Sequence, residues 1–235
     1  MKSEMHVAAL WRYPVKSMLG ETCQTADVDR RGVVGDRMFA VRYADGKFGS
    51  GKNTRRFRKI DGLFEFSSAY EDGVAVVRFP DGSAYRIDDP DIDTALSNAL
   101  RQPVSVTREG SVPHFDAGAL HLVTTDALAD LQRRSPDLTV DARRFRPNLV
   151  IDSAGEPLPD DDWIGKTVTI NDVSLEIVDL TERCAMVTFS QSELPAEPGM
   201  LKSIAQHRNL QFGVYADVRT PGRIQCGDAV IVAGD

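Results

Sequence analysis

Cysteine is scarce in this sequence. The three cysteines, Cys23, Cys184 and Cys226, are far apart and form no CxxC pair. We therefore expect neither a disulfide framework nor an iron–sulfur cluster held by four cysteines of this chain. Long apolar runs are missing too, because no stretch approaches the roughly 18 residues that span a bilayer. Glu4 and His6 interrupt the apolar residues near the start, so we predict neither a signal peptide nor a membrane span.

Positive charge is in the minority. The 28 lysines and arginines face 35 aspartates and glutamates, which gives a formal net charge of −7. This balance argues against a general nucleic-acid binder but leaves room for a local basic pocket that binds an anion. The length of 235 residues and the 42% of hydrophobic residues suit one large or two small globular domains. The low cysteine count fits a reducing compartment, and we expect a cytoplasmic protein.

Short strand-like segments dominate the chain. They include 32–43, 145–151 and 185–189, whereas 125–134 has the period of a short helix. Many short strands with few helices favour a mostly β (α+β) fold of β-barrels with a few short peripheral helices, rather than a βαβ sheet. Residues 108–117 (REGSVPHFDA) show no clear period. We place a domain boundary there, with a smaller domain at 1–108 and a second domain at 109–235.

Two segments near the N-terminus carry candidate phosphate ligands. Lys16 and Ser17 follow a strand at a proline-containing turn, and Arg37 begins a later strand. An ammonium, a hydroxyl and a guanidinium fork could together bind a phosphate monoester. The simpler interpretation is a surface ion pair of Asp36 with Lys16 or Arg37.

A third segment, 144–151 (RFRPNLVI), places Arg146 and Asn148 on either side of a proline at a predicted strand start. Strand alternation would put both side chains on one face, where they could offer donors to an anion or to the edge of a heterocycle. The alternative is an edge strand with two polar residues facing water.

Cys184 lies at the end of a predicted strand, directly after Arg183. A neighbouring guanidinium favours the thiolate, which is the form of cysteine that binds metals or attacks electrophiles. A single cysteine in a strand-rich protein is more often a buried small apolar residue, and we interpret Cys23 and Cys226 in that way.

The segment 46–53 (GKFGSGKN) nearly matches a nucleotide phosphate loop. Asn53 stands where the pattern needs a hydroxyl, and no apolar helical face follows. We interpret it as a glycine loop. The cations after it form a basic cluster that is either a solvated face or a docking site for an anion or an acidic partner; its members are Lys52, Arg55, Arg56, Arg58 and Lys59.

Taken in order, these segments resemble the MOSC family, which is named for the C-terminal domain of molybdenum-cofactor sulfurases. The resemblance is carried by LWRYPVKSMLGE (10–21), GDRMFAV (35–41), FRPNLVI (145–151), IGKTVTI (164–170), ERCAM (182–186) and PGRIQCGDAV (221–230). It implies a MOSC N-terminal β-barrel domain followed by a MOSC domain with a β-barrel core.

The resemblance also implies residue roles around a molybdenum–molybdopterin cofactor. Cys184 would ligate the metal, as the cysteine does in the amidoxime-reducing branch, with Arg183 beside it. The remaining cofactor contacts would come from both halves of the chain: Lys16, Ser17 and Arg37 on the phosphate, Arg146 and Asn148 on the pterin, Lys52 as a further basic contact, and Thr124 and Thr125, which sit where the family uses a small polar residue.

Three functions are compatible with this resemblance. The first is a molybdenum-dependent reductase of small N-hydroxylated compounds that receives electrons from a separate electron-transfer protein or reductase, for which the basic cluster is a possible docking face. The second is a cofactor carrier, or a sulfur-relay protein acting through a Cys184 persulfide. The third is a non-enzymatic β-barrel ligand binder in which Cys184 belongs to the core. The substrate, the electron donor and the oligomeric state are not encoded in any motif that we can interpret.

Overall fold

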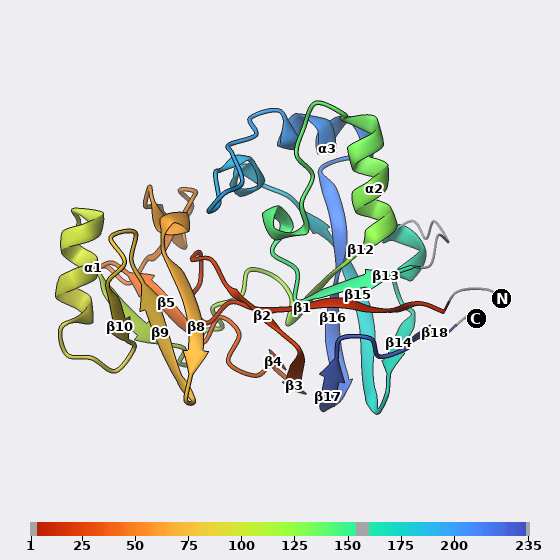
Figure 1. Cartoon of the computed structure of the whole chain (residues 1–235), viewed down its shortest axis with the longest axis horizontal. Helices are drawn as coiled ribbons and strands as arrows, with labels where there is room; N and C mark the ends of the chain where they lie inside the picture. The colour runs from red at the N-terminus through yellow and green to blue at the C-terminus, as the bar shows by residue number, and fades with distance from the viewer. Residues whose placement is uncertain (1–3, 154–159, 234–235) are drawn as a thin grey trace.

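The structure, a computed structural model, describes residues 4–153 and 160–233. Figure 1 shows two lobes side by side, with the small lobe built from residues 39–108 and the large lobe built mainly from the C-terminal half. The first strand, β1 (His6–Arg12), belongs to the large lobe. Both described ends of the chain lie at that lobe.

The large lobe is an eight-stranded sheet in the order β18-β14-β15-β16-β12-β13-β1-β2. Besides β1, its strands are β2 (Glu21–Cys23), β12 (Leu120–Thr124), β13 (Leu149–Asp152), β14 (Thr167–Ile170), β15 (Val173–Glu182), β16 (Gln211–Thr220) and β18 (Val230–Val232). Strand alternation buries one apolar face inside the curved sheet, as Ile170, Leu175 and Ile177 show. The pairing orders are those of open sheets, but Val230 N donates to Met5 O at 2.8 Å, which draws β18 toward the start of β1.

Two helices cover the other face of this sheet, α2 (Thr125–Arg134) and α3 (Met200–Arg208). Their apolar residues, including Leu131 and Ile204, pack with Phe145 and Phe212. Strands β12 and β13 are parallel and are joined through α2. The molecule is mostly β, as predicted, yet it contains this one βαβ unit, which the short strands of the sequence did not indicate.

The small lobe contains two sheets, in the orders β11-β5-β6-β7 and β10-β9-β8, with α1 (Ile92–Leu100) against them. Its strands are β5 (Phe39–Arg42), β6 (Phe48–Ser50), β7 (Phe57–Lys59), β8 (Ser67–Glu71), β9 (Val74–Arg78), β10 (Ala84–Arg86) and β11 (Ser105–Arg108). A third small sheet, β17-β3-β4, joins β3 (Thr25–Asp29) and β4 (Gly32–Val33) to β17 (Gly222–Gln225).

Residues 13–20 leave the large lobe after β1, pass through the core of the small lobe and return to the large sheet at β2. Val15 and Met18 are fully buried in the core of the small lobe, and isolated bridges pair Val15 with Phe39 and Leu19 with Ser67. Lys16 and Ser17 therefore lie where the lobes meet. The predicted boundary at 108/109 stays a prediction; β1, from the first predicted domain, pairs with β13, from the second.

Two strand predictions near the site are wrong in part. Residues 185–188 form the 3₁₀ helix η4 (Ala185–Thr188) instead of a strand, and η2 (Ala142–Phe145) replaces the start of the strand predicted at 145–151. A further 3₁₀ turn, η1 (Leu63–Glu65), precedes β8, and η3 (Asp160–Trp163) precedes β14. Short apolar runs suit buried 3₁₀ turns as well as strands, so local pattern alone does not separate the two.

Candidate functional site

A cavity of about 390 Å³ is lined by residues of both lobes. Its walls come from segments that are far apart in the sequence. Eight of the predicted site residues line it, namely Lys16, Ser17, Arg37, Lys52, Arg146, Asn148, Arg183 and Cys184. The two lobes thus bring a thiol and five cationic side chains to one concave surface, which is the usual shape of a ligand site.

Three of these residues have left-handed backbone conformations. The φ angles of Ser17, Arg37 and Arg146 are 66°, 49° and 54°. Such conformations cost a non-glycine residue about 1–3 kcal/mol each and persist where the surroundings impose them. Arg146 ends η2 in this conformation instead of starting a strand, so the predicted alternation of Arg146 with Asn148 on one strand face is wrong.

Lys16 is an almost completely buried cation. Its side chain is 5% exposed, and its Nζ lies 2.6 Å from Oδ1 of Asp116. The ammonium also stands over the ring of Phe57, at 5.0 Å from the centroid. Burial lowers the pKa of Lys16 to about 8, although Asp116 opposes this shift. Lys16 is therefore a cation whose charge can change in mildly alkaline solution.

Arg37 forms a buried ion pair with Asp36, not the surface pair that was the simpler alternative. The Asp36 side chain is 4% exposed, and its Oδ1 also accepts a hydrogen bond of 2.8 Å from Tyr13 N. Arg37 N donates to Tyr13 O at 2.7 Å, and Arg37 Nη2 donates to Arg146 O at 3.3 Å. Arg37 is thus held by β1, its own neighbour and the η2 turn together.

The Arg146 guanidinium lies between two aromatic rings, 4.2 Å from the Tyr13 centroid and 5.3 Å from that of Phe64. Nη1 donates to Met18 O at 2.7 Å. Nη2 is buried and has no hydrogen-bond partner among the described residues. Burial lowers the pKa of Arg146 to about 10. A buried donor without an acceptor is costly, so this atom points to an acceptor from outside the chain.

Arg183 and Cys184 come directly after β15. Arg183 Nη2 donates to Phe145 O at 2.7 Å, whereas its Nε is buried and meets no acceptor within residues 4–153 and 160–233. Burial lowers the pKa of Arg183. Cys184 is half-buried, with extended backbone at the start of η4. Its thiol group is free and belongs to the cavity wall.

The Asn148 side chain lines the cavity and also joins three strands. Its Oδ1 accepts from His121 N at 3.2 Å, and its Nδ2 donates to Trp11 O at 3.3 Å. Both ends of the amide are therefore used inside the protein, which holds β1, β12 and the start of β13 in register.

Thr124 and Thr125 do not line the cavity. Thr124 caps α2, because its Oγ1 accepts a 3.1 Å hydrogen bond from Ala127 N. Thr125 Oγ1 donates to Asp152 at 3.4 Å. The structure gives these two threonines roles in the β12–α2–β13 unit rather than at the wall of the cavity.

The sequence interpretation missed several lining residues, above all Asp116, Gly118, His121 and Tyr215. The first two belong to or adjoin the aperiodic segment interpreted as a domain boundary. Gly118 is packed so closely that a Cβ would lie 2.6 Å from the Tyr215 ring. Burial and Arg183 lower the pKa of His121 well below its usual range, so this imidazole is neutral. Polar residues in a loop of this kind were the signal that could have indicated the site.

Two family models match the chain. The MOSC domain matches residues 104–231, and the MOSC N-terminal beta barrel domain matches residues 4–126. The chain belongs to the MOSC family. The two MOSC matches together cover nearly all described residues, and they overlap around the predicted domain boundary.

The relatives of this MOSC chain include an amidoxime-reducing component and a molybdenum cofactor sulfurase. The mitochondrial amidoxime-reducing component 1 of Homo sapiens is 24% identical, in an alignment that covers 97% of this chain and 83% of that protein. The molybdenum cofactor sulfurase of Oryza sativa subsp. japonica is 23% identical over 92% of this chain. The chain spans only 33% of the length of that sulfurase. Among solved structures, the YUAD protein from Bacillus subtilis superimposes with a TM-score of 0.57 at 14% identity, covering 98% of this chain and 96% of its own, which shows a shared fold.

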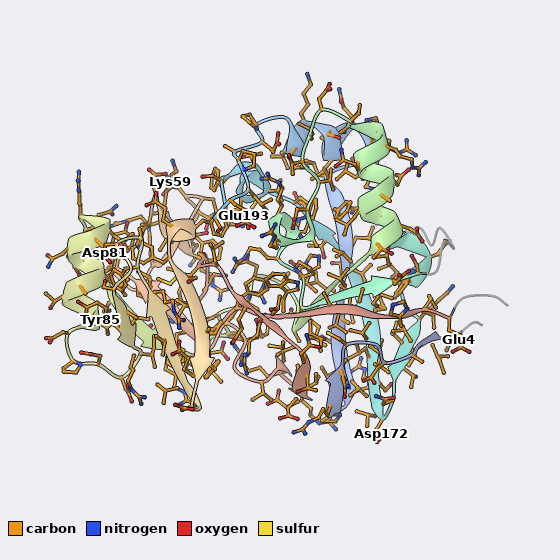
Figure 2. The ribbon with its side chains drawn as sticks, in the orientation of Figure 1. Glu4, Lys59, Asp81, Tyr85, Asp172 and Glu193 are labelled. Atoms are coloured by element: carbon orange, nitrogen blue, oxygen red, sulfur yellow. The ribbon has the colours of Figure 1, made fainter. Side chains whose placement is uncertain are left out.

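The basic cluster at 52–59 is divided between the cavity and the surface of the MOSC chain. Lys52 lines the cavity. Arg58 pairs with Asp45 at 2.9 Å, and Lys59 pairs with Asp61 at 2.8 Å; Figure 2 shows Lys59 at the outer edge of the small lobe. No group of three or more His, Cys, Asp or Glu side chains that could hold a metal occurs among the described residues. No helix in that part of the chain is long and apolar enough to cross a membrane.

Proposed function

We propose that the cavity between the lobes binds a molybdenum–molybdopterin cofactor and that the protein reduces small N-hydroxylated compounds. The observation that carries this proposal is the composition of the cavity wall, where a free thiol lies among cationic side chains. Two guanidinium nitrogens of that wall, Arg146 Nη2 and Arg183 Nε, are buried without acceptors among the described residues. An anionic, acceptor-rich ligand would satisfy them. The residues present therefore fit the group.

Each wall would contribute a different contact. Lys16, Ser17 and Arg37 would hold the phosphate of the cofactor, since they combine two cations and a hydroxyl. Arg146 would meet the pterin. Cys184 would supply a thiolate, which is a soft ligand suited to a thiophilic metal.

When bound, the cofactor would supply the two-electron redox chemistry that converts an N–OH group, two electrons and two protons into N–H and water. The task of the chain is to bind and orient. The buried pair Arg37–Asp36 and the ion pair between buried Lys16 and half-exposed Asp116 fix the cations of the wall before ligand arrives, so little reorganisation accompanies binding.

Electrons would come from a separate electron-transfer protein or reductase. The basic cluster is the docking face that we propose for it, although the ion pairs of Arg58 and Lys59 and the place of Lys52 in the cavity wall leave the exposed Arg55 as the stronger candidate. A reducing compartment such as the cytoplasm would keep Cys184 as a free thiol.

The test is to prepare the protein in a host that makes the cofactor and to measure molybdenum by mass spectrometry and pterin by fluorescence. Cys184→Ser should lose molybdenum and turnover with reduced viologen on a panel of amidoximes and hydroxamic acids. Cys226→Ser is the matched control, because Cys226 is also half-buried but packs against the core of the large lobe. Metal-loaded protein that reduces none of these substrates would contradict the reductase proposal.

A second candidate rests on the position of Cys184, a half-buried free thiol in the wall of a cavity rather than in the core. The protein would then carry the cofactor or relay sulfur as a Cys184 persulfide, received from an outside donor. Tight pterin binding without turnover, together with a persulfide on Cys184 in the mass spectrum, would favour this function over the reductase.

A further inference from the structure

A second cavity, of about 230 Å³, lies next to the first and shares Arg146 with it. Among the residues that line it are Trp11, Tyr13, Gln191 and Glu193. Figure 2 shows Glu193 where the two lobes approach each other. Pockets for drug-sized ligands hold roughly 300–1,000 Å³, so this one is large enough only for a small molecule.

Two buried donors on its wall lack acceptors. Gln191 is 2% exposed, and its Nε2 is buried without a hydrogen-bond partner in the described part of the chain. The same holds for Arg146 Nη2, which carries two hydrogens and belongs to a residue that borders both cavities, so that one hydrogen can serve each cavity. Gln191 is fixed by its backbone, which exchanges two hydrogen bonds with Leu194, at 3.0 and 2.9 Å. The backbone at Gln191 is therefore held in place, while the side-chain donor has no acceptor among the described residues.

Two aromatic rings, those of Trp11 and Tyr13, form part of the wall. Trp11 and Tyr13 are stacked, with centroids 6.4 Å apart and ring planes 14° apart. The rings of Tyr13 and Phe64 contact the Arg146 guanidinium, and Met18 O accepts a hydrogen bond from its Nη1. The free edge of the guanidinium and the flat ring surface together suit a planar ligand that carries an acceptor at one end.

The charge of that acceptor follows from the neighbouring ions. Glu193 also lines the cavity, but it pairs with Arg143, which in turn pairs with Asp141 at 2.8 Å. Arg143 thus serves two carboxylates, and Arg146, which forms no ion pair among the described residues, is the cation next to Gln191 that remains for a ligand. We propose that this second cavity is a binding site for a small planar carboxylate, held by Arg146 and Gln191 against the Trp11–Tyr13 wall.

Benzoate is the probe for this site, and the two tryptophans provide an internal comparison. Trp11 lines the cavity, whereas Trp163 is 2% exposed in the core of the large lobe. Benzoate added to the purified protein should shift the indole N–H resonance of Trp11 with saturation and leave that of Trp163 in place. Benzamide has the same shape without the charge and should bind at least about tenfold more weakly, since hydrogen bonds to charged groups are the stronger ones.

Gln191 variants separate this site from non-specific binding. Gln191→Leu should weaken benzoate about tenfold, and Gln191→Glu should weaken it further by adding a like charge. Gln206→Leu, an exposed position on α3, should have no effect. Circular dichroism of each variant confirms folding. The proposal is overturned if Trp11 does not respond, if benzamide binds as well as benzoate, or if folded Gln191→Leu binds benzoate unchanged. The readout needs neither bound cofactor nor turnover, so it stands apart from the proposed function.

Discussion

The basic segment at 52–59 and the wall of the main cavity are both rich in cations, but these cations differ in their exposure and in their ion-pair partners. On the surface, Arg58 and Lys59 pair with Asp45 and Asp61, and all four side chains are at least 43% exposed. In the cavity, Arg146 and Arg183 are half-buried, each has a buried nitrogen without an acceptor, and neither has an ion-pair partner among the described residues. A run of cations in the sequence therefore does not show where the electrostatic potential of the folded protein is positive, because that potential also depends on where the fold places the carboxylates.

The energetic consequence is that the two regions should respond differently to the same substitution. Exposed ion pairs contribute about 0–1 kcal/mol, because water and salt screen them. Buried charges lose their hydration, so the removal of one partner leaves the other in a poor environment. A fold that keeps such groups in a cavity gains ligand binding rather than stability from them.

The largest difference should appear when Arg37→Met is compared with Arg58→Met. Arg37→Met leaves the 4%-exposed Asp36 without its counterion, and we expect a loss of about 3–5 kcal/mol in the free energy of unfolding. Arg58→Met should cost about 0–1 kcal/mol. Urea unfolding measures both. Similar losses in the two variants would show that the Asp36–Arg37 pair is no more desolvated than the surface pair.

The next difference concerns affinity for an anion. Arg183→Met removes a buried guanidinium from the cavity and should weaken the binding of inorganic sulfate about tenfold, which corresponds to one charge-assisted hydrogen bond. Arg58→Met should leave the affinity unchanged, because its charge is already compensated by Asp45. Calorimetric titration at low salt gives both values. Equal weakening would mean that sulfate senses net charge and not this cavity.

The sequence predicts the elements whose pattern is strong. The helix expected at 125–134 is α2, where apolar residues recur with the helical period. It fails where few residues carry the pattern, as in η4, and where the backbone conformation is set by distant contacts, as at Arg146. The parallel pairing of β12 with β13 depends on how α2 packs against the sheet, and no local period records it.

The candidate site was predictable only in part, for a similar reason. The basic and thiol residues stand in recognisable segments, so eight of them could be nominated before the fold was known. Their partners could not, because Lys16 and Asp116 are 100 residues apart and Asp116 stands in a segment without a period. The roles of Thr124 and Asn148 within the sheet also follow from tertiary hydrogen bonds alone.

The smallest effect, and the sharpest in sign, should come from the titration of Lys16. Its pKa is about 8 in the folded protein, against an ordinary value of 10.5. Between these values the unfolded chain binds more protons than the folded one, so this group makes the protein more stable as pH rises. Sulfate prefers the ammonium form, so its affinity should fall severalfold as pH rises from about 7 to about 9. Stability and affinity should therefore change in opposite directions over one pH range.

Lys16→Met isolates this contribution, because the variant has no titrating group at that position. Measurements in a Cys184→Ser background remove the thiol from the comparison, and His121 does not interfere because its pKa lies well below this range. The difference between the parent and Lys16→Met should show both trends: urea stability that rises between about pH 8 and 10.5, and sulfate affinity that falls with a midpoint near pH 8. If the two proteins have parallel pH profiles, Lys16 keeps its proton throughout. Its burial beside Asp116 would then cost much less folding free energy than the contrast between exposed and buried cations implies.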